Sequence, residues 1–204
     1  MNNKELSELN HKQWSIYREK NKDKILNKYP NHNFKVRIKV MKDFKKILEE
    51  EQVTLFLAGG SLLGFYRDND FIAWDDDVDM DVLAEELEPK FEIVKEKLLK
   101  MGYLVRTIKE YPRMKINVYH EGEKIGILAL YLNKNKNIRY RTDYVWPAEI
   151  YEEQNRKTVI FKDVVFEAPD VEKYIFHTYG ESWNKPITKD KNYLSKKVFL
   201  RNMR

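Results

Sequence analysis

Five aspartates crowd into residues 75–81, and they restrict the fold of this chain more than any other feature of it. From Asp77 to Val82 acidic and apolar residues alternate strictly. In an extended strand this places Asp77, Asp79 and Asp81 on one face and the apolar residues between them on the other. We therefore predict a β-strand with one side against a core and a row of acids on the opposite side.

A row of carboxylates needs a cation. Alternate side chains on one strand face stand roughly 6.5 to 7 Å apart, so two neighbours can lean onto one ion while a third extends the cage. Without that ion the acids repel one another, which raises their pKa values and costs stability. Hard divalent ions prefer oxygen ligands and serve in-line displacement at phosphorus. The cluster predicts a Mg²⁺ or Mn²⁺ site for phosphoryl-type transfer, and an acidic exposed loop or a calcium site are the alternatives.

A glycine turn precedes the acids by 14 residues. Thr54 to Leu57 is a short β-branched and aromatic run that breaks off at Gly59-Gly60, which predicts a strand leading into a tight turn. Ser61 would then cap the following helix. Backbone N–H groups at such a helix start bind phosphate, because no side chain obstructs them and the helix end is partially positive. Turn and acids together favour a reaction centre over an exposed acidic loop.

The remaining patterns indicate the fold class. Helical periodicity is clear over Phe34 to Glu50 and over Glu88 to Met101. Strand-like runs occupy residues 103–108, 114–119, 124–132 and 156–166, and a helix is predicted over 171–179. This order of elements predicts an α+β fold in which helices flank a mixed β-sheet. We expect a single domain over residues 1–204, with residues 1–50 as its helical N-terminal part.

Composition limits the compartment and the partners. The chain of 204 residues is 42% hydrophobic, enough for one substantial core, and its lack of cysteine excludes disulfides, zinc thiolate sites and cysteine nucleophiles. No stretch approaches the roughly 18 to 20 apolar residues of a membrane span, so a cytoplasmic location is expected. Residues 1–50 carry 13 Lys and Arg against 7 Asp and Glu. This excess fits a solvated helix face, a nucleic acid, an anionic membrane surface or a phosphate-bearing substrate.

One longer pattern joins the motifs: the Gly-Gly-Ser-Leu-Leu-Gly turn, then Arg67, then Trp-Asp-Asp-Asp-Val-Asp at Trp74 to Asp79. The segment Leu57 to Val82 that contains them resembles the signature of the LicD/fukutin family, within the polymerase-β-like nucleotidyltransferase superfamily. The resemblance implies a nucleotidyltransferase-like fold. It also implies an enzyme that moves phosphocholine or a polyol phosphate from a CDP-linked alcohol donor to a hydroxyl of a glycan or glycolipid, as in cell-surface polysaccharide modification.

The resemblance assigns roles by position. Asp77 and Asp79 would be the catalytic, metal-binding pair, with Asp75 as a further metal ligand. Donor phosphate would be held at the turn and balanced by a cation, and the residues concerned are Gly59, Gly60, Ser61 and Arg67. Lys115 lies on a predicted strand face with Arg113 and Asn117, where it either contacts donor phosphate or belongs to a solvated surface.

One departure from the family pattern leaves alternatives open. Family members usually supply another acid from a later strand, and the counterpart here carries Ala129. Asp81 or Asp143 is a candidate replacement; otherwise the chain is a nucleotide-binding module with altered catalysis. A third reading is transfer of a nucleotide to RNA or a small molecule, although no base-reading module is visible and no nucleic-acid partner is expected. The basic N-terminal helices leave a peripheral membrane contact open.

Overall fold

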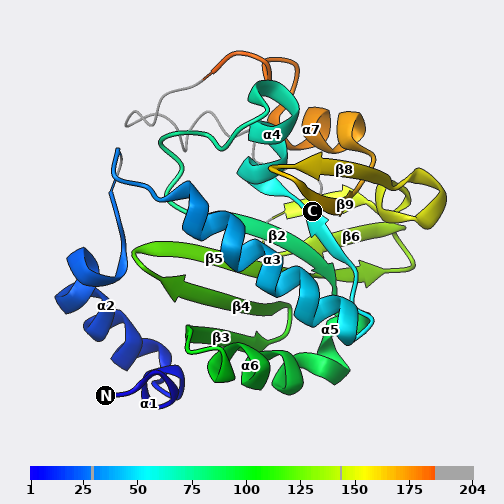
Figure 1. The fold of residues 1–204 in the computed structure, drawn as a ribbon. Helices are drawn as coiled ribbons and strands as arrows, with labels where there is room; N and C mark the ends of the chain where they lie inside the picture. The colour runs from blue at the N-terminus through cyan, green and yellow to red at the C-terminus, as the bar shows by residue number, and fades with distance from the viewer. Residues whose placement is uncertain (29, 143, 187–204) are drawn as a thin grey trace.

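The computed structural model describes residues 1–28, 30–142 and 144–186, and Figure 1 shows its ribbon. Within this part nine strands form one mixed sheet in the order β3-β4-β5-β2-β1-β9-β8, and β6 pairs with both β5 and β7. The strands are β1 (Leu55–Leu57), β2 (Val78–Leu83), β3 (Leu104–Glu110), β4 (Arg113–His120), β5 (Glu123–Asn133), β6 (Ile138–Arg141), β7 (Tyr144–Pro147), β8 (Lys157–Phe161) and β9 (Val164–Ala168).

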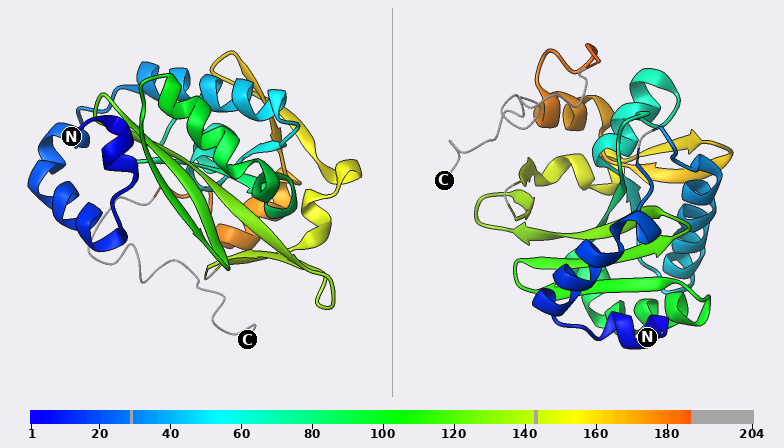
Figure 2. Two further views of the ribbon diagram at one scale, coloured as in Figure 1. Left: turned by 90° about the horizontal axis from the view of Figure 1, so that it is seen from below. Right: turned by 90° about the vertical axis from the view of Figure 1, so that its left-hand side faces the viewer.

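Helices lie on both faces of the sheet. α3 and α6 cover one face, and α7 lies on the other together with the β6–β7 hairpin (Figures 1 and 2). The helices are α1 (Asn3–Ser7), α2 (His11–Ile25), α3 (Phe34–Glu50), α4 (Gly59–Asp68), α5 (Ala84–Leu87), α6 (Phe91–Lys100) and α7 (Val171–Tyr179), with short 3-10 turns at Glu88–Lys90, Ala148–Tyr151 and Glu153–Asn155. The predicted α+β class with a mixed, helix-flanked sheet is confirmed.

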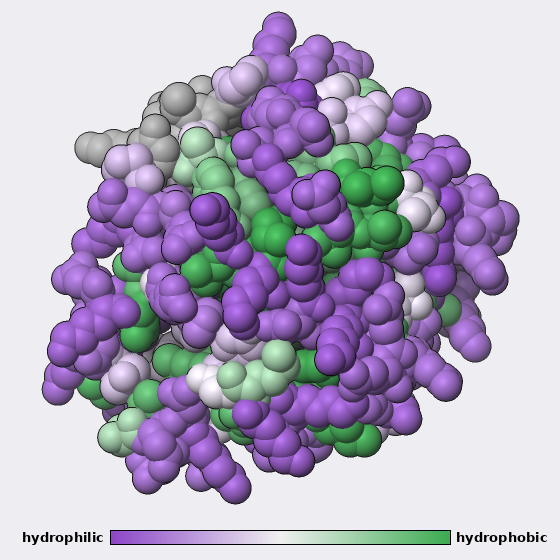
Figure 3. All heavy atoms as spheres, in the orientation of Figure 1, coloured by the Kyte–Doolittle hydropathy of each residue, from purple (hydrophilic) through white to green (hydrophobic). Residues whose placement is uncertain are grey.

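The outer surface on the α3 side is mainly hydrophilic, with hydrophobic residues gathered in the region where Figure 1 places β8 (Figure 3). The cavity described below lies on the opposite face of the sheet. Within the described residues, no helix combines the length and the apolar character that crossing a lipid bilayer requires.

The acid-bearing strand β2 sits at the centre of the sheet. It runs antiparallel to β1 and parallel to β5, and its apolar residues Val78, Met80 and Val82 are fully buried. Alternation then directs Asp79 and Asp81 to the other face. The strand predicted from the alternating acids is therefore present, and Asp77 stands immediately before its first residue.

Two parts of the sheet differ from the sequence prediction. The run 156–166 is a hairpin of β8 and β9, because Lys162 and Asp163 both adopt positive φ (50° and 62°), the conformation of a tight two-residue turn. The strands β6 and β7 were not predicted, because β6 alternates over only four residues and buries its two arginines rather than its apolar residues. They pair with the end of β5 and extend the sheet over the acid-bearing face.

The buried side of α3 contains a charged residue. Its fully buried residues include Val40, Met41, Phe44 and Leu48, as the periodicity predicts. Arg37 lies on the same side and is also fully buried. Such a residue needs polar partners within the protein, and those partners belong to the candidate site.

The helices α1 and α2 pack on the outer part of the sheet through a small hydrophobic cluster of their own, which joins Leu6 and Trp14 to Leu104 and Tyr119. Arg106 links β3 to the N-terminal helices. Its Nη1 donates to the carbonyl oxygens of residues 6, 7 and 9, and its guanidinium lies 4.8 Å from the ring centroid of Trp14 in α2. We propose that residues 1–50 belong to one domain with the rest of the chain.

If this domain assignment holds, urea unfolding gives one transition by circular dichroism, and Trp14→Ala lowers its unfolding free energy by about 3 to 5 kcal/mol because a buried ring is lost. Ile16→Ala on the same helix is the control, since Ile16 is 50% exposed. A separate early transition that Trp14→Ala alone shifts would instead mark α1 and α2 as an independent unit.

Candidate active site

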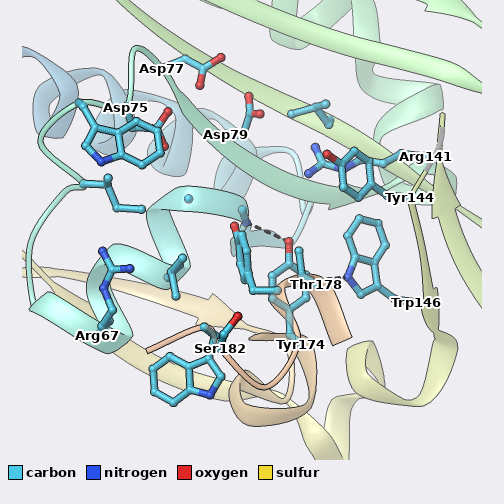
Figure 4. A pocket seen from close by; sticks show the side chains of 18 of the residues that line it. Arg67, Asp75, Asp77, Asp79, Arg141, Tyr144, Trp146, Tyr174, Thr178 and Ser182 are labelled. Carbon is cyan, nitrogen blue, oxygen red and sulfur yellow. Dashed lines mark hydrogen bonds between the residues drawn. The ribbon is translucent and has the colours of Figure 1, made fainter. Parts of the chain in front are cut away.

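A cavity of about 620 Å³ opens on the acid-bearing face of the sheet. Figure 4 shows Asp75, Asp77 and Asp79 on one side of it and the side chains of Tyr144 and Trp146 on another. The residues that line it come from α4, from the segment that ends in the acid loop (residues 75–77), from β2 and β5, from the β6–β7 hairpin and from the chain at and after α7: Gly59, Gly60, Leu63, Arg67, Ile72, Trp74, Asp75, Asp77, Asp79, Leu128, Arg141, Thr142, Tyr144, Trp146, Tyr174, Thr178, Tyr179, Ser182, Trp183 and Lys185.

Gly59 and Gly60 at the start of α4 are each required for a different structural reason. Gly59 adopts φ +57°, a conformation that residues with a Cβ rarely take. At Gly60 an added Cβ would stand 2.2 Å from Asp75 Oδ2, so only a residue without a side chain allows that carboxylate to lie against the helix start. The amide of Gly59 donates to the Tyr174 hydroxyl at 2.9 Å. The turn therefore brings Asp75 to the partially positive end of α4.

Three carboxylates converge in the loop before β2. Oxygens of Asp75, Asp76 and Asp77 lie within 4.8 Å of one another, a set of ligand atoms able to hold a metal ion. Asp79 is not part of this group, but it lines the same cavity and has Asp77 as a neighbouring charge. The donor atoms are all oxygens, which suits Mg²⁺ or Mn²⁺.

The charge on these acids is incompletely balanced. Burial, and then the charges of Asp77 and Asp79, raise the pKa of Asp75 to about 7. Burial and Asp77 also raise the pKa of Asp79. A divalent cation would remove this repulsion, so the residues present fit such an ion on chemical grounds.

Cations from distant strands balance part of the cluster. Lys124 of β5 forms an ion pair with Asp77, and although burial opposes it, this carboxylate and that of Asp79 hold the pKa of Lys124 above its usual range. Arg141 of β6 lies 3.2 Å from Asp81, whose other oxygen accepts from the Tyr151 hydroxyl at 3.2 Å. Asp77 and Asp81 are thus partly neutralised within the protein.

The acid loop is also held from behind by Arg37. Its Nη2 donates to the backbone carbonyl of Asp75 at 2.9 Å, and its Nε donates to Glu123 at 2.7 Å. Glu123 is fully buried and also accepts from the amide of Asn33 and the side chain of Asn27. These contacts fix the position of the loop relative to α3 and β5.

The other predicted site residues, Ser61, Arg67 and Lys115, lie at three different places in the structure. Ser61 is buried and does not line the cavity, and α4 begins earlier, with Ala58 as its N-cap, so Ser61 does not cap the helix. Arg67 lines the cavity and forms a two-point contact with its neighbour Asp68. Lys115 lines a second cavity beside the first.

The register of β5 clarifies the position of the missing acid. Leu128 pairs with Asp81 and lines the cavity, whereas Ala129 pairs with Val82 and belongs to the hydrophobic core. The β5 position that faces the acids is thus Leu128. Asp81 is fully buried against Arg141 and does not line the cavity, so the structure gives it a different role from that of a replacement ligand. Asp143 lies outside the described residues.

Sequence reasoning missed Arg141. For Trp146 beside Tyr144, here called the aromatic wall, the sequence allows either a surface on which a ligand stacks or packing in the core. Trp146 is buried and stacks on Tyr174 at 5.5 Å with an interplanar angle of 8° while still lining the cavity, so both readings hold for it. The signal for Arg141 was weak, because the alternation of residues 138–141 extends over only four positions.

Acids gathered at a helix start above a mixed sheet are typical of enzymes that transfer nucleotidyl or phosphoryl groups. The sequence model of the LicD/FKTN/FKRP nucleotidyltransferase domain matches residues 52–171, more than half of the chain. The chain belongs to this family, which confirms the resemblance seen in its motifs and supports an enzyme of the phosphotransferase or nucleotidyltransferase type.

Solved structures give more distant similarities. The antibiotic-resistance factor ANT(2'')-Ia in solution is 12% identical, with a TM-score of 0.49 over 79% of this chain and 80% of that chain. A cytoplasmic RNA terminal U-transferase is 16% identical, with a TM-score of 0.37 over 61% of this chain and 36% of that chain. A search of curated protein sequences finds no match. At these identities neither structure bears on the substrate of this chain.

Arg37→Met should lower the unfolding free energy by about 3 to 5 kcal/mol, because it leaves Glu123 buried without its charged partner. Lys39→Gln is the matched control on the same helix: its ion pair with Asp43 leaves the Lys39 side chain 57% exposed, so a change below about 1 kcal/mol is expected. Urea unfolding measures both. Equal effects of the two substitutions would contradict a structural role for the Arg37 contacts.

The acids predict a pH dependence of stability. The pKa of Asp75 in the folded protein is about 7, above the value of about 4 expected in the unfolded chain. The folded state therefore retains a proton that the unfolded state releases, and stability falls as pH rises from about 4 to 7. Thermal unfolding in EDTA should show this fall, and Asp75→Asn should reduce it, unlike Asp163→Asn at the exposed β8–β9 turn. Added Mg²⁺ should raise the midpoint more at pH 8 than at pH 5.

Proposed function

We propose that this protein transfers a phospho-alcohol, either phosphocholine or a polyol phosphate, from a CDP-linked donor to a hydroxyl of a glycan or glycolipid, with Mg²⁺ or Mn²⁺ as cofactor. The observation that carries the proposal is that Asp75, Asp77 and Asp79 line one cavity together with the Gly59-Gly60 start of α4. A cytoplasmic location belongs to the same proposal.

The cavity suits a donor of this size. Its volume of about 620 Å³ lies within the roughly 300 to 1,000 Å³ of pockets that bury small ligands. The carboxylates occupy one side, Arg67 another, and aromatic side chains line the rest. A diphosphate fits near the acids and the α4 start, and the apolar parts of a donor fit against Trp146 and its neighbours.

The carboxylates of Asp75, Asp77 and Asp79 would hold the metal, which would supply charge neutralisation at the phosphate oxygens. The protein's own groups do the rest. Arg67, which pairs with Asp68 at the cavity wall, would exchange this partner for a donor phosphate, and Arg37 keeps the acid loop in place through the Asp75 carbonyl. The aromatic wall excludes water from the donor.

The proposed reaction is a single displacement at phosphorus. The acceptor oxygen forms a bond to the phosphorus that carries the alcohol, and the bond from this phosphorus to the bridging oxygen of the nucleotide breaks. CMP leaves, and the acceptor hydroxyl loses its proton. Asp79 lines the cavity beside Asp77, and we assign the oxygen of its carboxylate that does not face the metal to accept this proton.

One observation favours a second function. The β5 position that faces the acids is Leu128, where the family pattern implies a further acid. A nucleotide-binding module with altered catalysis would then show stabilisation by CDP-linked compounds without turnover. Turnover therefore separates the two functions.

Incubation with CDP-choline, CDP-ribitol or CDP-glycerol, Mg²⁺ and a panel of glycans should release CMP and add the phospho-alcohol mass to an acceptor. Asp77→Asn and Asp79→Asn should each lower kcat by about 100-fold or more, because the displacement loses charge stabilisation. Asp163→Asn, exposed and distant, is the control and should retain activity. A product that carries the nucleotide itself, or full activity of Asp79→Asn, would refute the proposal.

A further inference from the structure

A second cavity of about 410 Å³ adjoins the first on the β4 side of the acids. The two cavities share Leu128, Arg141 and Thr142. The α4 start and the acid loop line only the first one. The second is lined by the β3–β4 turn and strands β4 to β6, through Pro112, Arg113, Met114, Lys115 and Ala129 besides the shared residues.

The second cavity is strongly basic. Arg113 and Lys115 alternate along β4 and so share the face of the sheet that carries the acids. Within the described ranges 1–28, 30–142 and 144–186, the side chain of neither residue forms an ion pair or a hydrogen bond, and Arg113 is exposed. Burial, and then the charge of Lys124, lower the pKa of Lys115, whereas the charge of Asp79 opposes this fall.

Arg141 adds a third cation. It is buried, its only ion pair among the described residues is with Asp81, and its Nε and Nη1 have no hydrogen-bond partner there. Three cations thus face a cavity whose lining, among the described residues, contains no acid. Asp81 pairs with Arg141, and the charge of Asp79 offsets part of the charge of Arg141 and Lys115 from the neighbouring cavity. The remaining charge matches an anion with one or two negative charges, such as a phosphate group.

The position of this cavity assigns it to the acceptor. Leu128 lies between Lys115 and Asp81 in the sheet register, so the cavity reaches the acids from the β4 side, away from α4. A donor diphosphate bound at the α4 start leaves this side open to the attacking hydroxyl. We propose that the second cavity binds a phosphate group of the acceptor, so that the acceptor is a phosphate-bearing glycan. This inference rests on the proposed function.

Binding of inorganic phosphate tests the cavity independently of turnover. Isothermal titration in EDTA compares the wild-type protein with Arg113→Gln and Lys115→Gln, and each variant should bind phosphate about tenfold more weakly because a charge-assisted hydrogen bond is lost. Lys157→Gln removes the same charge from exposed β8 and should leave binding within about twofold of wild type. Unchanged phosphate binding in both cavity variants overturns the proposal.

Kinetics distinguish an acceptor phosphate from a donor phosphate. With matched acceptors that do or do not carry phosphate, Arg113→Gln should raise KM about tenfold for the phosphorylated acceptor and leave KM for the donor unchanged. A rise in donor KM alone would assign the cavity to the donor and overturn the inference. If no donor is consumed but both variants lose phosphate binding, the anion site stands and the proposed reaction fails.

Discussion

Mutual repulsion among the aspartates of residues 75–81 is the constraint on which this structure depends. Five carboxylates in seven residues are compatible with a folded core because distant segments surround them with positive charge. Lys124 pairs with Asp77, Arg141 pairs with Asp81, and Arg37 holds the loop from the α3 side. The repulsion left at Asp75 and Asp79 is what a divalent ion would relieve.

The topology follows from the need to bring those cations to one place. The strand β2 is central, so β5 lies directly beside it and delivers Lys124, while the extension of the sheet through β6 delivers Arg141. The same extension places Arg141 between two cavities. A single residue thereby balances Asp81 and separates the acid-lined cavity from the basic one.

Local sequence patterns predict much of this arrangement. The alternation of Asp79 with apolar neighbours predicts the strand, since a period of two can bury one face only in an extended chain. The Gly59-Gly60 pair predicts the turn, because few other residues allow the backbone conformation and the close approach found there. The family match, over residues 52–171, covers both motifs. Arg37 lies outside that range, and nothing in the helical periodicity of α3 shows that it contacts the acid loop.

The sequence by itself determined the acid strand and the glycine turn, because each depends on residues close in the chain, and the order of its predicted elements indicated the mixed α+β class. Only the tertiary structure decided that Leu128 rather than Ala129 faces the acids, that Arg141 neutralises Asp81, and that Lys115 lines a cavity of its own. The physical reason is register: shifting a strand by one residue exchanges its two faces, and residues 125–130 of β5 are all apolar, so their sequence shows no alternation that tells one face from the other.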